Sequence, residues 1–235
     1  MTPPTKTAPS RPEHSPMDPA KKARRVIWIL LAIIVGAGII WFAVFTAAKP
    51  APVEPQAAPD AQLVREDSHR VTSPATEKAQ LVEFLDFECE ACRAAVPLVE
   101  ELKKEFGDQV TFVNRYFPLP SHKNSGQAAL AVEAAAQQGK YEQMYAKMFE
   151  TQPQWGEKQD FQNALFRTFA EELGLDMEKY DAAMAAEETK ERIRKDIADG
   201  KALGVSGTPT FFLNGEKLTL NTEAEFRQKL ADAVK

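Results

Sequence analysis

Two cysteines, Cys89 and Cys92, are the residues of this chain whose type and spacing point most directly to chemistry. They are the only cysteines among its 235 residues, and two residues separate them. On a helix, side chains three positions apart lie about 5–6 Å apart at Cβ, so Cys92 can close a short disulfide onto Cys89 after a modest adjustment. The spacing therefore predicts a redox pair.

The sequence around the pair predicts a strand that turns into a helix. Residues 81–87 form a short apolar run rich in strand formers, whereas residues 93–106 repeat their apolar side chains at helical spacing. Cys89 thus lies where the helix begins, and the unpaired N–H groups and positive dipole end there stabilise a thiolate. We expect Cys89 to be the attacking sulfur and Cys92 the resolving one.

Two other interpretations of the cysteines compete with this one. A stabilising disulfide is disfavoured, because a ring this small removes little loop entropy from the unfolded chain. A zinc site would need two further ligands, and the histidines available, which show no paired spacing, are His14, His69 and His122. We expect no metal ion and no organic cofactor.

The rest of the C-terminal region predicts an α/β domain. Residues 109–117 are rich in β-branched and aromatic side chains, and the order strand, helix, strand predicts a parallel pair with a right-handed crossover. A hairpin is expected at 210–213 and 217–220, around Asn214-Gly215. A weak edge strand is expected around 63–71. The expected helices, which form an inserted block and a closing helix, are 125–138, 141–149, 160–173, 177–186, 187–203 and 223–234.

Three segments are predicted in front of this domain. Residues 1–25 are rich in proline with few apolar side chains, which predicts a disordered tail. Residues 26–45 are uncharged and long enough to cross a bilayer, so we expect a transmembrane helix over 26–48. The Pro/Ala-rich stretch 49–79 predicts an extended linker that holds the domain off the membrane.

The basic residues that flank the apolar segment predict its orientation. Four precede the segment and one follows it: Lys21, Lys22, Arg24 and Arg25, and then Lys49. Because the more basic flank stays in the cytoplasm, we expect a single-pass cell-membrane protein with a cytoplasmic N-terminus and an extracytoplasmic domain. A cleaved signal peptide is the alternative, which residues 46–48 keep open, although the apolar run is longer than a typical signal core.

The charge of the exported part limits its partners. The first 48 residues carry six Lys or Arg and two Asp or Glu, so a chain of net charge −5 leaves −9 for residues 49–235. A domain this acidic is a poor candidate for nucleic acid or anionic lipid surfaces. Proteins or small thiols are the expected partners, with the membrane contacted through one helix.

The chain from about residue 80 to its end resembles the DsbA-like thioredoxin-fold proteins, particularly membrane-anchored ones. The resemblance rests on Cys89-Glu-Ala-Cys92 after an apolar strand, on Tyr116-Phe-Pro-Leu119 followed by His122, and on the run 204–213, which contains Thr208-Pro209. It implies a thioredoxin fold over 80–235, with a helical insertion at about 119–203.

The resemblance also implies roles for residues outside the CxxC segment. Pro209 is expected to be cis and to face the disulfide, with Thr208 offering backbone groups to an extended substrate; an X-Pro bond permits this. Glu83 is expected to point inward beneath the disulfide, where burial would raise its pKa and suit it to accept a proton from Cys92. From strand periodicity alone, Glu83 could equally be a solvated edge residue.

The implied activity is thiol-disulfide oxidoreduction on exported proteins that contain cysteines, with a membrane or small-thiol redox partner. A disulfide isomerase or reductase is the nearest alternative, and a membrane-tethered chaperone-like peptide-binding module is another. The dipeptide Glu90-Ala91 departs from the Pro-His of the best-known DsbA proteins. Because Glu90 places a negative charge near the thiolate, we expect a weaker oxidant.

Overall fold

The computed structural model describes residues 28–31, 33–36, 38 and 60–235. The chain divides into two compact units, 1–54 and 55–235. In the first unit the described residues are helical, and large apolar side chains such as Trp28 and Ile34 are exposed. Within the described residues, no helix has the length and apolarity needed to cross a bilayer. The predicted tail, the remainder of the predicted span 26–48 and the linker up to residue 59 lie outside the described residues.

The second unit is built on a mixed five-stranded sheet with the order β1-β3-β2-β4-β5. The central strand β2 pairs in parallel with β3, and the other pairings are antiparallel. The predicted parallel pair and the strand at 210–213 are therefore confirmed. The strands are β1 (His69–Arg70), β2 (Ala79–Leu85), β3 (Val110–Tyr116), β4 (Thr210–Leu213) and β5 (Glu216–Lys217).

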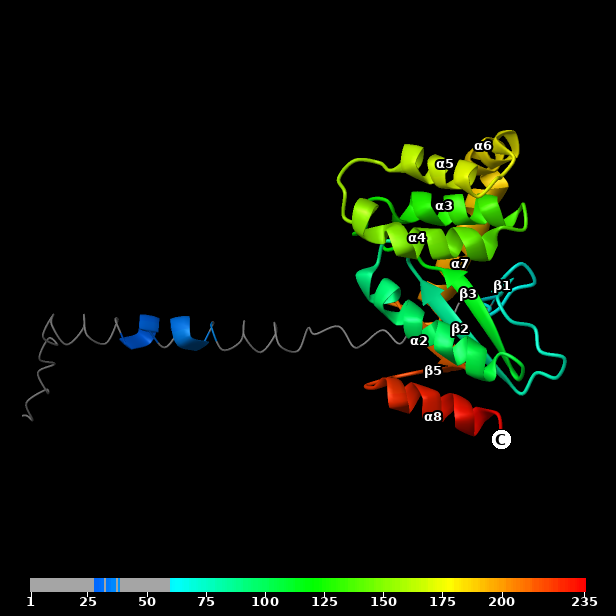
Figure 1. The fold of residues 1–235 in the computed structure, drawn as a ribbon. Helices are drawn as coiled ribbons and strands as arrows, with labels where there is room; N and C mark the ends of the chain where they lie inside the picture. Colours follow the sequence, from blue (N-terminus) through cyan, green and yellow to red (C-terminus); the bar gives the residue numbers. More distant parts are fainter. Residues whose placement is uncertain (1–27, 32, 37, 39–59) are drawn as a thin grey trace, which may run out of the picture. The chain divides into compact units, whose positions relative to one another are not determined.

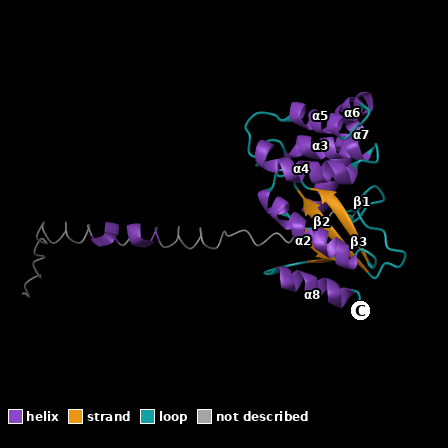
Figure 2. Cartoon of the chain, in the orientation of Figure 1, coloured by secondary structure: helices purple, strands orange, loops and turns teal. Residues whose placement is uncertain are grey.

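Helices cover both faces of this sheet and form a separate layer at one end of it, where α3, α4, α5 and α6 lie together (Figure 1). Five helices separate β3 from β4, as the predicted helical insertion requires (Figure 2). The described helices of this unit are α2 (Glu90–Phe106), α3 (Ser125–Ala136), α4 (Tyr141–Trp155), α5 (Asn163–Glu172), α6 (Met177–Ala185), α7 (Glu187–Ala202) and α8 (Glu223–Ala233).

The two faces of β2 are buried against different helices. Leu81 packs with Val99 and Leu102 of α2 and with residues of α8, whereas Val82 and Phe84 pack on the other side, towards α7. On that second side Gly200 brings α7 close to the sheet, because a Cβ there would meet the rings of Phe117 and Phe84 within 3.0 Å. β2 is thus buried on both faces, and its residues are apolar except for Gln80 and Glu83.

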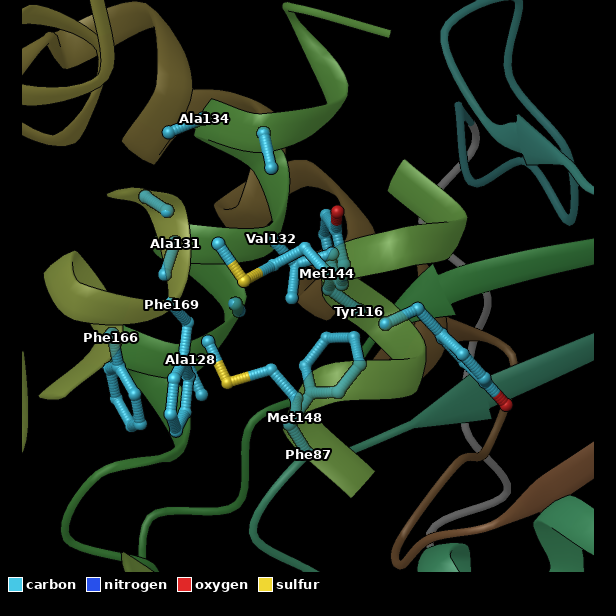
Figure 3. Packing of buried hydrophobic residues seen from close by; sticks show 14 of the residues in the cluster. Phe87, Tyr116, Ala128, Ala131, Val132, Ala134, Met144, Met148, Phe166 and Phe169 are labelled. Atoms are coloured by element: carbon cyan, nitrogen blue, oxygen red, sulfur yellow. The ribbon is translucent and has the colours of Figure 1, made fainter. Parts of the chain in front are cut away.

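The helical layer has its own core, and the strand that leads to the cysteines runs into it. Phe87 lies near Met148 in this core, together with Tyr116 at the end of β3 (Figure 3). The Phe87 ring also packs against Phe149, with 5.1 Å between ring centroids. The residues just before Cys89 are therefore anchored in the insertion.

Several predicted boundaries are wrong, and packing explains the largest differences. Helix α4 continues to Trp155 instead of ending at 149, because Gln152 and Trp155 lie on its buried face although Pro153 interrupts its hydrogen bonding. The second hairpin strand, predicted at 217–220, is only Glu216–Lys217, and the predicted edge strand at 63–71 shrinks to His69–Arg70.

The predicted linker 49–79 also ends earlier than expected, because its described part belongs to the folded unit. Leu63 and Val64 pack against the core beneath α7. The buried guanidinium of Arg115 donates to the carbonyls of Gln62 and Leu63, at 3.0 and 2.6 Å. The linker was predicted from the proline and alanine content of residues 49–79. Composition alone could not reveal that Leu63 binds Arg115, which is 52 residues away.

Candidate redox site

The two cysteines lie at the N-terminus of α2, as the sequence predicted. Cys89 is the N-cap residue, with extended backbone, and α2 begins at Glu90. Both cysteines are free thiols in this structure. Cys89 is 8% exposed and Cys92 only 1%. The sulfur that an incoming thiol or disulfide can reach is therefore that of Cys89.

The surroundings of Cys89 favour its thiolate. A hydrogen bond from the Cys92 thiol lowers the pKa of Cys89 to about 5, although burial opposes this, and the backbone N–H groups of Cys92 and Ala91 contribute further. Those two N–H groups are among the unpaired donors of the first helical turn. A pKa this low favours the thiolate at neutral pH, and the role of Cys89 as the attacking sulfur stays a prediction.

Cys92 has the opposite electrostatic environment. Burial raises its pKa well above the ordinary range, and the hydrogen bond with Cys89 and the charge of Glu83 add to the rise. The N–H of Asp86 donates to the Cys92 sulfur at 3.5 Å and partly offsets these effects. One thiolate and one thiol, three residues apart, form the asymmetric pair that thiol-disulfide exchange requires.

Thr208 and Pro209 lie beside the pair. Their peptide bond is cis, as the resemblance implied. The Thr208 carbonyl accepts a hydrogen bond from the Cys89 thiol at 3.3 Å, across 119 residues of sequence. The Thr208 hydroxyl is buried and has no partner among the described residues. The loop before β4 therefore brings backbone polar groups to the reactive sulfur.

Glu83 is a buried residue of the central strand and not a solvated edge residue. It is 4% exposed, and its Oε2 has no hydrogen-bond partner among the described residues. Because side chains alternate along a strand, Glu83 shares the face of Leu81, which α2 covers. Burial raises its pKa to about 8, with further increases from the charges of Glu100 and Cys89 and a decrease from Lys103.

Glu90 and Ala91, between the cysteines, are both exposed on the first turn of α2. The Glu90 side chain makes no hydrogen bond or ion pair with the described residues. Its charge is therefore screened by solvent, and its influence on Cys89 is smaller than that of a buried group at the same distance.

Gln152, a residue that the sequence did not point to, holds the loop 86–89 against the helical layer. We call this loop between β2 and α2 the catalytic loop. Its side-chain amide donates to the carbonyls of Phe87 and Cys89, at 2.7 and 3.0 Å, and accepts from Arg93 at 3.0 Å. Gln152 lies in the last turn of α4, beyond the predicted helix end. The helical spacing of Tyr145, Phe149 and Gln152 could have revealed this turn.

A second set of missed residues links the catalytic loop to the segment after β3. The buried Glu88 carboxylate accepts the N–H groups of Asn124, at 2.5 Å, and Glu157, at 2.9 Å. Asp86 accepts from Leu119 at 2.8 Å and lies 2.7 Å from His122 Nδ1. The sequence signal for these contacts was the position of Asp86 and Glu88, two acidic residues directly before the CxxC segment.

The remaining histidines do not join the cysteines. His14 lies outside the described residues. His69, on the edge strand β1, has its Nε2 2.7 Å from Glu133 and 3.0 Å from the Tyr116 hydroxyl. Over the described ranges, no group of three or more His, Cys, Asp or Glu side chains is arranged to hold a metal ion.

A nucleophilic thiol at a helix N-terminus, a buried partner thiol and a cis-proline loop define a redox-active dithiol site on a thioredoxin fold. A solved thioredoxin-like oxidoreductase from Silicibacter pomeroyi DSS-3 is 28% identical to the chain, with a TM-score of 0.62; the match covers 75% of this chain and 96% of that one. The same fold occurs in the thiol-disulfide exchange protein α-DsbA2 from Wolbachia pipientis, which is 18% identical with a TM-score of 0.57; the match covers 68% of this chain and 84% of that one. It also occurs in BdbD from Bacillus subtilis, which is 20% identical with a TM-score of 0.61; the match covers 69% of this chain and 91% of that one.

Residues 70–232 match the family described as thioredoxin, and this chain belongs to that family. Its structural neighbours are DsbA-like thiol-disulfide oxidoreductases. Among curated relatives, the Na⁺/H⁺ antiporter NhaA 1 of Mycobacterium sp. (strain KMS) is 30% identical over 205 residues, which are 85% of this chain and 32% of the antiporter. The Na⁺/H⁺ antiporter NhaA of Herminiimonas arsenicoxydans is 34% identical over 177 residues, which are 74% of this chain and 25% of the antiporter. The chain thus spans about a third or less of these relatives.

Proposed function

We propose that this chain is a membrane-anchored thiol-disulfide oxidoreductase that forms or exchanges disulfides in exported proteins. The observation that carries the proposal is the asymmetry of the pair: a reachable Cys89 with a pKa of about 5 beside a buried Cys92 whose pKa is raised. A structural disulfide needs no such asymmetry, whereas an exchange reaction needs one good leaving thiolate and one protected thiol.

In the oxidising direction, a client thiolate attacks the Cys89 sulfur of the disulfide. The Cys89–Cys92 bond breaks, the client sulfur bonds to Cys89, and Cys92 leaves with the electron pair and takes up a proton. A second client thiolate then attacks the client sulfur of the mixed disulfide and releases Cys89 as a thiolate. The client loses two electrons and two protons, and the pair becomes the reduced Cys89 thiolate and Cys92 thiol; one proton is on Cys92 and the other has gone to solvent. No metal or organic cofactor takes part in these steps.

Glu83 is the proposed proton carrier for Cys92. With a pKa of about 8, its carboxyl group exchanges a proton near neutral pH, as a general acid or base must. Burial on the face covered by α2 puts its charge close enough to act on Cys92. When Cys92 resolves a mixed disulfide, Glu83 accepts the thiol proton; in the reverse step it returns the proton.

Thr208 and Pro209 are the proposed client-binding residues. The Thr208 carbonyl accepts from Cys89 only while Cys89 is a thiol, so it is free when Cys89 is a thiolate or is bonded to a client. An extended client segment can then donate a backbone N–H to it, since an unpaired edge carbonyl is a ready acceptor for a peptide strand.

The proposed location is the outer side of the cell membrane. The apolar run 26–45 and its basic flank support a single membrane anchor with a cytoplasmic N-terminus. The exposed apolar side chains at 28–31 and 33–35 are consistent with a lipid environment. The relatives that contain a matching segment are named as Na⁺/H⁺ antiporters, which are membrane proteins.

Trapping of clients tests the proposed function. In membranes that contain the full-length chain, Cys92→Ala should accumulate mixed disulfides with exported proteins on non-reducing gels, because the resolving thiol is absent. Cys89→Ser should trap few, and it should abolish insulin reduction. A chaperone-like binding module should lose nothing with Cys89→Ser, and unchanged insulin reduction in that variant would refute the redox proposal.

Accessibility to protease tests the proposed location. Protease added to intact cells should remove the redox domain and leave the N-terminal tail intact. Protection of the whole chain would contradict an extracytoplasmic domain.

A further inference from the structure

Asp86 connects the catalytic loop to both cysteines and to the loop after β3. Its carbonyl accepts the N–H of Cys89 at 3.1 Å, and its own N–H donates to the Cys92 sulfur at 3.5 Å. Its carboxylate accepts the N–H groups of Glu88 and Leu119, both at 2.8 Å. The Asp86 side chain is fully buried. A negative charge is therefore held within the loop that must also carry the Cys89 thiolate.

His122 is the residue that faces the Asp86 carboxylate, and its ring compensates that charge when it is protonated. Its Nδ1 lies 2.7 Å from Asp86 Oδ2, and its side chain is 23% exposed, so one edge of the ring remains in contact with solvent. The two residues are 36 positions apart in the sequence, and only the fold brings them together. Such a pair of a buried carboxylate and an imidazolium is a charge-assisted hydrogen bond.

The negative charges nearest His122 favour its protonated form. Burial lowers its pKa, but the hydrogen bond and charge of Asp86 and the charges of Cys89 and Glu88 outweigh burial and raise it. Burial raises the pKa of Asp86, and the hydrogen bonds from Leu119, Glu88 and His122 offset only part of that rise. Without an imidazolium, the Asp86 carboxylate and the Cys89 thiolate would be two like charges on one short loop.

We propose that His122 is a positioning residue for the redox reaction: its imidazolium neutralises the Asp86 carboxylate, so that the catalytic loop can carry Cys89 as a thiolate. This inference rests on the proposed exchange activity and adds to it. The cation that favours the thiolate then comes from the loop after β3 and not from the dipeptide between the cysteines. Stabilising the thiolate favours the reduced pair and makes the disulfide more oxidising.

Fastening the loop does not require a cation at this position. Hydrogen bonds already hold the segment after β3. The Phe117 N–H donates to the Leu85 carbonyl at 2.7 Å, and the Asn124 N–H donates to the Glu88 carboxylate. The Leu119 N–H on Asp86 is a third attachment. An uncharged donor at 122 would keep these contacts, so charge and fastening can be separated by mutation.

His122→Gln in the full-length chain is the test, because glutamine can donate to Asp86 without carrying a charge. The Cys89 thiolate absorbance should titrate about one pH unit higher, within the range that a nearby charge produces. The equilibrium with glutathione should shift about tenfold towards the disulfide form of the protein, which corresponds to roughly 30 mV. The double variant Asp86→Asn/His122→Gln should return towards the natural protein, because the uncompensated carboxylate is gone.

Lys123→Gln is the matched control. Lys123 is the next residue and is exposed, with its ammonium 4.3 Å from the centre of the Phe161 ring. Loss of this screened charge should change the glutathione equilibrium by less than about twofold. A His122→Gln variant that folds and matches the natural protein in both measurements overturns the proposal. A natural protein that does not exchange with glutathione would instead refute the proposed function.

A measurement on the natural chain covers the case in which His122→Gln does not fold. If the His122 and Cys89 charges interact, each must shift the other's titration by the same free energy. The pKa of the His122 ring, followed by NMR, should therefore be higher in the reduced protein than in the oxidised one. Equal values in the two states would overturn the proposal.

Discussion

Two buried groups of charged residues, on opposite faces of the same sheet, differ in how completely they are paired. On the α7 side, the guanidinium of Arg115 is fully buried and contacts Asp196 at 2.7 Å and Asp199 at 2.6 Å. Arg65 also pairs with Asp199, at 2.5 Å. On the α2 side, Glu83 has an oxygen without any hydrogen-bond partner among the described residues.

The pKa values follow this difference in pairing. Burial tends to raise the pKa of Asp199, but the hydrogen bonds from Arg65 and Arg115 outweigh burial and lower it. Nothing comparable offsets burial at Glu83, whose pKa rises to about 8. The paired group stabilises the charged form and fixes the fold, whereas the unpaired group can gain and lose a proton near neutral pH.

Breaking the paired group should give the largest effect. Arg115→Met leaves Asp196 and Asp199 buried with too few partners, and we expect a loss of about 3–5 kcal/mol in the free energy of unfolding. Urea unfolding of the full-length chain measures it. The control is Arg227→Ala, because Arg227 pairs with Glu101 and Glu105 on the exposed surface and should contribute less than about 1 kcal/mol. Equal losses in the two variants would contradict the comparison.

Replacing the unpaired group should give a smaller effect that depends on pH. At pH below 4.5, Glu83 is protonated in both the folded and unfolded chain and costs nothing. Between pH 4.5 and about 8 the unfolded chain is ionised while the folded chain is not, so folding stability falls as pH rises. Glu83→Gln removes this penalty, and its advantage over the natural protein should grow with pH to about 3 kcal/mol at pH 7.

The control for that measurement is Glu101→Gln, an exposed carboxylate on α2. Its stability difference from the natural protein should change little over the same pH range. The Glu83→Gln variant should also resolve mixed disulfides more slowly, since no carboxylate then accepts the Cys92 proton. A stability difference that is flat with pH would mean that Glu83 titrates normally.

The smallest effect is expected at the exposed dipeptide. Glu90→His replaces a negative charge near Cys89 with a group that can donate or carry a positive charge, so the thiolate pKa should fall and the potential rise. Solvent screening limits the shift to less than about one pH unit, or roughly 30 mV. Equilibration with glutathione measures it. A lower potential in Glu90→His would show that the electrostatic account of the dipeptide is wrong.

A weaker oxidant was predicted from Glu90 and Ala91, the two residues between the cysteines, alone. Sequence proximity suggested that Glu90 sets the charge near Cys89, but Glu90 is exposed on the first turn of α2. The fold adds His122, which no periodicity connects to Cys89. Under our proposal the potential depends on both residues, and the comparison of Glu90→His with His122→Gln determines which one has the greater influence.

The sequence by itself determined the features that depend on near neighbours. An apolar strand, two cysteines at helical spacing and an amphipathic helix place the redox pair at a helix N-terminus, because local hydrogen bonding and hydrophobic periodicity act over a few residues. The helix order of the insertion and the strand at 210–213 were predictable for the same reason.

Only the tertiary structure decided which distant groups surround that pair. The burial of Glu83, the contact of Cys89 with Thr208 and the attachments made by Gln152 and His122 all join residues far apart in the chain. The folding of residues 62–72 onto the domain is of the same kind. Burial and charge pairing depend on what packs against a side chain, and a one-dimensional pattern carries that information only where the partner lies nearby in the sequence.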